Sequence, residues 1–142
     1  MKALTGLTLV ALSLGLAACN SSEDAAKPSG EPIAAVPAPA GTSWSATVNE
    51  TPEGNFVMGN PDAKLKLVEY GSFTCSHCAD FAETASPEIR ERVDTGKMSY
   101  EFRTYVRDPI DLTTALLARC GGKDVFYPVS YTHLTLPTNR EV

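Results

Sequence analysis

The middle of the chain changes from one hydrophobic period to another. Residues Leu65 to Tyr70 mix β-forming apolar residues with polar ones in partial alternation, which predicts a strand. From about Ser76 to Val93, apolar residues recur at steps of three and four, which predicts an amphipathic helix. Pro87 lies inside this helix and is expected to kink it. The apolar face consists of Cys78, Phe81, Ala82, Ala85, Ile89 and Val93.

A second strand and a second helix come after this pair. Met98 to Tyr105 alternates apolar and polar residues again and predicts a strand. Strand, helix and strand within about forty residues predict a βαβ unit with a parallel strand pair. Another helix is expected from Asp108 or Asp111 to Arg119, with two glycines after it to end it. The expected fold class is therefore α/β.

The N-terminal residues read as an export signal. Lys2 is followed by an almost uncharged apolar run to Ala18, which is too short for a membrane-spanning helix. The sequence Leu-Ala-Ala-Cys that ends at Cys19 resembles the lipobox of bacterial lipoproteins, in which the cysteine receives a diacylglycerol after cleavage. Residues 1–18 are thus expected to be a lipoprotein signal peptide, with lipidation at Cys19. The alternative is an ordinary signal peptide that leaves Cys19 as a spare thiol.

Two further segments are expected to lie outside the folded domain. Residues 19–54 are rich in Ala, Pro, Ser and Gly, which predicts a flexible tether in which Trp44 is incidental. A partial domain is expected over residues 55–128. The last segment, residues 129–142, reads VSYTHLTLPTNREV and resembles translated adapter read-through, so we expect a non-native tail after a truncated domain.

Net charge and the number of cysteines limit the classes of function that the chain can have. The net charge at pH 7 is −5 and no basic stripe occurs, so nucleic acid is not an expected partner. With Cys19 lipidated, three of the four cysteines remain for the exported domain. Cys120 is predicted to be a buried thiol that behaves as a small apolar residue. A redox role for Cys120 is the alternative.

The stretch YGSFTCSHCA carries the candidate chemistry, because Cys75 and Cys78 stand where a strand hands over to a helix. The unpaired N–H groups and partial positive charge of a helix N-terminus favour a thiolate, so Cys75 is expected to be a nucleophile. His77 could add a second polarising group. Alternatives are a structural disulfide, or a zinc site that would need Cys120 and His133 as further ligands.

Two blocks of sequence carry a family resemblance. LVEYGSFTCSHCADF resembles the active-site segment of the DsbA-like branch of the thioredoxin superfamily, and YVRDPIDLTTALLARCGG resembles the segment after the second strand in that branch. The resemblance implies a partial thioredoxin-like fold: a βαβ unit with the Cys-X-X-Cys pair at the helix N-terminus, and the start of a helical insertion. It also implies a further β-hairpin, a terminal helix and a cis-proline loop, which the sequence after Tyr127 does not supply.

The same resemblance implies roles for site residues. Cys75 would be the nucleophile and Cys78 the resolving thiol, although the family usually has Pro-His between them and Ser76 replaces the proline here. Glu69 occupies the place of a family acidic residue beneath the active site, where a carboxyl of raised pKa could shuttle a proton to or from Cys78. The alternative for Glu69 is a solvated charge on an edge strand.

The implied activity is that of an enzyme, a protein thiol–disulfide oxidoreductase. Its expected partners are exported cysteine-containing proteins and a membrane redox partner, and no organic cofactor or metal is required. The expected location is periplasm-facing, with a lipid anchor to a bacterial membrane. Two alternatives remain, a non-catalytic thioredoxin-like binding module and an inactive fragment of a larger oxidoreductase.

Overall fold

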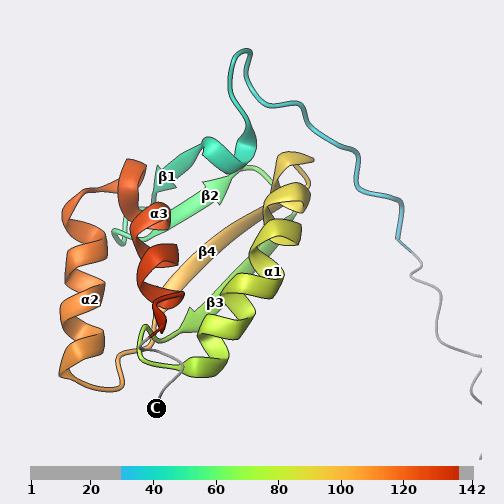
Figure 1. The fold of residues 1–142 in the computed structure, drawn as a ribbon. Helices are drawn as coiled ribbons and strands as arrows, with labels where there is room; N and C mark the ends of the chain where they lie inside the picture. The colour runs from blue at the N-terminus through green and yellow to red at the C-terminus, as the bar shows by residue number, and fades with distance from the viewer. Residues whose placement is uncertain (1–29, 138–142) are drawn as a thin grey trace, which may run out of the picture. The chain divides into compact units, whose positions relative to one another are not determined.

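A four-stranded mixed sheet organises the part of the chain that the computed structural model describes, residues 30–137 (Figure 1). All regular elements belong to one compact unit that starts at Ile33. In chain order they are η1 (Trp44–Ala46), β1 (Val48–Glu50), β2 (Phe56–Gly59), β3 (Leu65–Gly71), α1 (Ser76–Asp94), β4 (Met98–Thr104), α2 (Pro109–Cys120) and α3 (Lys123–Leu134).

The predicted βαβ unit is confirmed. The strand order is β1-β2-β4-β3, and β3 runs parallel to β4 with Leu65 opposite Met98 and Gly71 opposite Thr104. The other two pairs, β1 with β2 and β2 with β4, are antiparallel. Helix α1 makes the crossover between the parallel strands and continues through Pro87 to Asp94. The carboxyl ends of β3 and β4 therefore lie side by side. Helix α1 follows β3 in the chain, and α2 follows β4.

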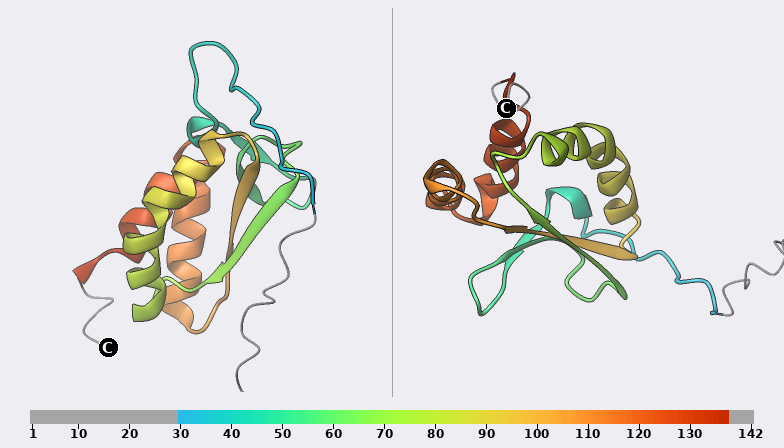
Figure 2. Two further views of the ribbon diagram at one scale, coloured as in Figure 1. Left: turned by 90° about the vertical axis from the view of Figure 1, so that its right-hand side faces the viewer. Right: turned by 90° about the horizontal axis from the view of Figure 1, so that it is seen from below.

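Helices α1 and α3 lie against one face of the sheet, and α2 packs beside α3 (Figure 2). The buried residues of α1 are Ala79, Ala82, Ile89 and Val93, of which the last three belong to the predicted apolar face. Cys78 and Ala85, also predicted, are partly buried against the core. Phe81 is the exception, because it stands at the edge of that face and is 42% exposed. Between the layers, Phe73 packs on Phe102 with ring centroids 5.5 Å apart.

The predicted second helix is also confirmed. Helix α2 starts after Asp108, whose side chain accepts a hydrogen bond from the main-chain N–H of Asp111. Pro109 occupies the first turn, where its missing N–H leaves no hydrogen bond unmade. The helix ends at Cys120, before the two glycines.

The segment expected to be a flexible tether is ordered from Trp44 onward, so the prediction of a tether to residue 54 is wrong for η1 and β1. Trp44 is 9% exposed, and its indole N–H donates to the carbonyl of Val36 at 2.7 Å. The Ser45 main chain and hydroxyl donate to the Asp94 carboxylate at 2.7 and 2.9 Å. Long-range contacts with the end of α1 hold this segment, and local composition does not reveal them.

The predicted non-native tail starts at residue 129, but residues 129–134 belong to helix α3. Ser130 and Leu134 are buried in that helix. The boundary predicted at residue 128 therefore does not coincide with the end of an element. That the tail is non-native stays a prediction.

Candidate redox site

The two cysteines of the motif lie at the carboxyl end of β3. Cys75 is the N-cap of α1, and its carbonyl accepts the first helical hydrogen bond from the N–H of Ala79 at 3.0 Å. Cys78 lies in the first turn of the helix and packs against the core. Both are free thiols of intermediate exposure, within hydrogen-bonding reach of each other. The structure thus brings together the pair that the sequence singled out.

The surroundings of Cys75 favour its thiolate. Partial burial raises the pKa of this thiol, but several groups outweigh burial. They are hydrogen bonds from the main chain and the thiol of Cys78, a hydrogen bond from the main chain of His77, and the positive charge of Arg107. Together they lower the pKa of Cys75 below its ordinary value, and a thiolate is the reactive form in disulfide exchange.

The surroundings of Cys78 act in the opposite direction. Burial raises the pKa of Cys78 most, and the neighbouring Cys75 and Glu69 raise it further, against a hydrogen bond from the main chain of Ser72. Cys78 is therefore the thiol that keeps its proton. Two neighbouring thiols with opposite shifts suit a nucleophile and a resolving group.

Glu69 is half-buried on β3, so a fully solvated charge on an edge strand does not describe it. Burial raises the pKa of its carboxyl, and a hydrogen bond from the Tyr100 hydroxyl to Oε2 at 2.5 Å opposes that rise. Burial and the charge of Glu69 in turn raise the pKa of Tyr100. The charge of Glu69 also raises the pKa of Cys78, and its role as a proton shuttle stays a prediction.

His77 contributes to the site with its main chain. Its N–H contributes to the lowered pKa of Cys75, while the residue as a whole is exposed. A role for the imidazole stays a prediction.

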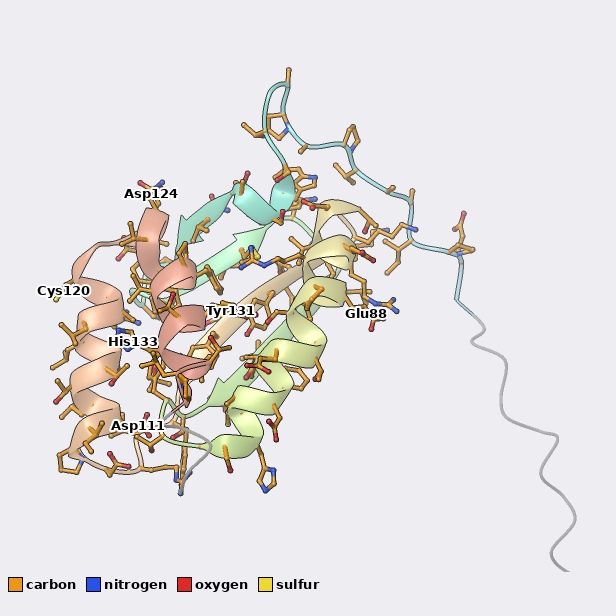
Figure 3. All side chains as sticks on the ribbon, viewed as in Figure 1. Glu88, Asp111, Cys120, Asp124, Tyr131 and His133 are labelled. Atoms are coloured by element: carbon orange, nitrogen blue, oxygen red, sulfur yellow. The ribbon has the colours of Figure 1, made fainter. Side chains whose placement is uncertain are left out.

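Cys120 is exposed, so the prediction of a buried thiol is wrong (Figure 3). It follows Ala118 by two residues, which turns it away from the buried face of α2, and it ends that helix at the opposite end from Asp111. Among residues 30–137, no three His, Cys, Asp or Glu side chains cluster in a way that could hold a metal ion. Cys19 lies outside the described residues.

Three site residues were missed in the sequence: Tyr100, Arg107 and Asp111. Tyr100 reads as an ordinary strand aromatic, and only the parallel register of β3 and β4 brings it to Glu69. Arg107 lies in the loop after β4, with no local feature that points to a cysteine. Asp111 reads as a helix-start residue, yet its carboxylate binds the loop that precedes Cys75.

The arrangement defines a class of redox site. A low-pKa thiol caps a helix, a second thiol lies one turn later, and a carboxyl of raised pKa lies beneath them on a strand of a parallel pair. This is typical of the thioredoxin-like disulfide-exchange site.

Comparison with known proteins agrees with that class. A protein-family model described as thioredoxin matches residues 51–140, and the chain belongs to this family. It is 42% identical over 71 residues to a Rickettsia bellii protein named "Putative protein-disulfide oxidoreductase", covering 49% of this chain and 27% of that protein. A Rickettsia prowazekii protein with a similar name is 39% identical over 71 residues and is covered to 26%. The chain thus spans about a quarter of the length of these curated relatives.

Crystal structures extend the likeness to the fold. A protein-disulfide isomerase from Novosphingobium aromaticivorans superposes with a TM-score of 0.54 at 39% identity, over 55% of this chain and 40% of that one. Wolbachia pipientis alpha-DsbA1 superposes with a TM-score of 0.55 at 31% identity, over 60% of this chain and 44% of that one. The fold is therefore thioredoxin-like and similar to DsbA. Within residues 30–137, no helix is both long and apolar enough to cross a membrane.

Proposed function

We propose that this chain carries the reactive centre of a DsbA-like protein thiol–disulfide oxidoreductase, with Cys75 as nucleophile and Cys78 as resolving thiol. The observation that carries the proposal is the opposite direction of the two pKa shifts at one helix N-terminus, lowered for Cys75 and raised for Cys78. An idle or merely structural pair would need no such difference. The names of the similar proteins support the same activity.

The exchange proceeds through a mixed disulfide. In the oxidising direction, a substrate thiolate attacks Sγ of Cys75 in the Cys75–Cys78 disulfide, the S–S bond breaks, and Cys78 leaves as a thiolate. Cys78 then takes up a proton, which the half-buried Glu69 can supply because burial raises the pKa of its carboxyl. A second substrate thiolate attacks the substrate sulfur of the mixed disulfide and releases the Cys75 thiolate. The substrate gains a disulfide, and the pair gains two electrons.

The reducing direction uses the same steps in reverse. The Cys75 thiolate attacks a substrate disulfide, and Cys78 resolves the mixed disulfide that forms. The reduction potential of the pair decides between the two directions, and the motif does not set it alone. In both directions the proposed substrates are exported proteins that contain cysteine pairs.

Thiol reactivity and turnover test the proposal together. Alkylation of the reduced chain, measured residue by residue by mass spectrometry, should give Cys75 a midpoint below the free-thiol value of about 8.5 and Cys78 a higher one. Cys75→Ser should abolish turnover of a dithiol peptide, and Cys78→Ser should leave a mixed disulfide on Cys75. Cys120→Ser is the matched control and should keep full activity, because Cys120 is exposed at the far end of α2. Turnover by Cys75→Ser would refute the proposal.

A non-catalytic binding module predicts a different pattern. Its partners would stay bound in the Cys75→Ser variant with unchanged affinity and form no mixed disulfide in the Cys78→Ser variant. Co-purification under alkylating conditions, with and without a reductant, separates the two functions. Covalent, reductant-sensitive capture by Cys78→Ser alone supports the oxidoreductase.

We further propose that the protein is lipid-anchored through Cys19 and faces the periplasm. The apolar run before this residue and its lipobox-like end support the proposal. In a bacterial host the protein should partition with membranes, whereas Cys19→Ala should be released or left unprocessed. Equal membrane association of the two forms, with the signal peptide removed from both, would contradict the anchor.

A further inference from the structure

Asp111 is a fully buried carboxylate, with 0% of the residue exposed, in the first turn of α2 (Figure 3). Its Oδ1 accepts a hydrogen bond from the main-chain N–H of Phe73 at 2.7 Å. Its Oδ2 accepts from the Ser72 hydroxyl at 2.6 Å and from the main-chain N–H of Arg107 at 3.0 Å. Three donors thus converge on one side chain, and each lies in a loop at the site.

The donors come from two loops that border the cysteine pair. Ser72 and Phe73 belong to the short link between β3 and Cys75, and Arg107 belongs to the link between β4 and α2. Asp108, the N-cap of α2, adds a parallel contact, because its Oδ2 accepts from the Thr74 hydroxyl at 2.8 Å. The residues directly before the nucleophile are therefore fixed to the start of α2.

We propose that Asp111 is a positioning residue of the redox centre, which holds the loop that ends in Cys75 and the main chain of Arg107 in a fixed relation to each other. This inference rests on the proposed function. A carboxylate suits the position because all three neighbours donate, and an ionised carboxylate only accepts. The packing of Phe73, 2% exposed beside Phe102, fixes the other side of the same loop.

The chemical consequence lies in the ionisation of Cys75. Its pKa depends, besides burial, on groups of α1, Cys78 and His77, and on Arg107 from the loop after β4. The geometry between these groups depends on the two loops that Asp111 joins. If Asp111 is lost, Cys75 and Arg107 can move apart, and the thiolate loses part of its stabilisation.

The Asp111→Asn variant tests the proposal with little change in volume. An amide keeps one acceptor oxygen and turns an NH2 group toward donors, so at least one buried N–H or O–H loses its partner. We expect the midpoint of Cys75 alkylation to rise and alkylation near neutral pH to slow about three- to tenfold, as loss of one charged hydrogen bond permits. Asp124→Asn is the matched control, the same change in the first turn of α3 at an exposed carboxylate, and should leave Cys75 unchanged.

A milder variant and a charge variant complete the test. Ser72→Ala removes one of the three donors and should raise the alkylation midpoint of Cys75 by less than Asp111→Asn does. It serves as the test if Asp111→Asn does not fold. Arg107→Gln keeps the main-chain contact and should raise the Cys75 midpoint without changing stability. A purely structural Asp111 would lower the urea midpoint of unfolding and leave Cys75 alkylation in the folded chain unchanged, which would overturn the inference.

The outcomes also separate this inference from the proposed function. A wild-type Cys75 that titrates like a free thiol would refute the proposed function whatever the variants do. A low wild-type midpoint that folded Asp111→Asn and Ser72→Ala both preserve would refute only the positioning role. A midpoint raised by both variants, with the control unchanged, supports it.

Discussion

Gly96 lies in the turn between α1 and β4 and packs against Val36 and Trp44 of the N-terminal segment, so replacing it by alanine should destabilise the fold. Its φ of +71° is one that residues with a Cβ rarely adopt. An added Cβ would overlap the carbonyl oxygen of Val36 and lie 2.8 Å from Nε1 of Trp44. These two atoms form the hydrogen bond that holds the indole, so the new methyl group would break it.

The magnitude is the sum of three contributions. A left-handed backbone costs a residue with a Cβ about 1–2 kcal/mol. Loss of the hydrogen bond between Trp44 and Val36 removes about 0.5–1.5 kcal/mol more. Relief of the overlap requires movement of the Val36 main chain, which also donates to the carbonyl of Thr95 at 2.9 Å. Gly96→Ala should therefore lower the free energy of unfolding by about 2–4 kcal/mol.

Gly41→Ala is the matched control. Gly41 has a similar φ of +81°, and a Cβ built on it would meet no atom within 4 Å. Its variant should lose at most about 1–2 kcal/mol. Urea unfolding monitored by fluorescence of Trp44 measures both variants, with far-UV circular dichroism as a second probe. Equal losses in the two variants would refute the packing of the N-terminal segment against the end of α1.

Two further variants probe polar side chains that are partly or fully buried, one on β3 and one on α3. Burial raises the pKa of Glu69 above its ordinary 4.5, so the folded chain holds this proton more tightly and its free energy of unfolding should fall as pH rises from about 4.5 toward the raised pKa. Glu69→Gln should flatten that fall in urea unfolding between pH 4 and 7 and lower the alkylation midpoint of Cys78; an unchanged pH dependence would contradict it. Tyr127→Phe removes a buried hydroxyl whose one hydrogen is shared between the carbonyls of Phe56 and Tyr100, 2.7 and 2.8 Å away, and should cost about 1–3 kcal/mol in the same assay. A loss below about 0.5 kcal/mol would contradict this hydrogen bond's contribution.

The sequence predicts those elements whose signals are local. The strand from Leu65, the helix from Ser76 and the strand from Met98 each carry their own period, and the structure reproduces their starts. Strand β1 has three residues and no period long enough to detect, so its pairing with β2 defines it. The same holds for Trp44, which looks incidental until Val36 and the end of α1 surround it. Tertiary contacts decide structure where the local pattern is weak.

Residues of the candidate site also differ in whether local sequence or tertiary contacts determine their place. The nucleophile could be predicted because a helix start is a local event, and Cys75 needs only its own helix to receive the N–H groups of His77 and Cys78. Other polar residues near the pair come from β4 and α2, far along the chain from the residues they contact: Tyr100 lies 31 residues from Glu69, and Asp111 lies 38 from Phe73. Their placement depends on which strands are neighbours and in what register. A Cys-X-X-Cys motif at a helix start therefore locates the thiol pair, while the contacts of Tyr100 with Glu69 and of Asp111 with Phe73 depend on how the later strand and helix pack.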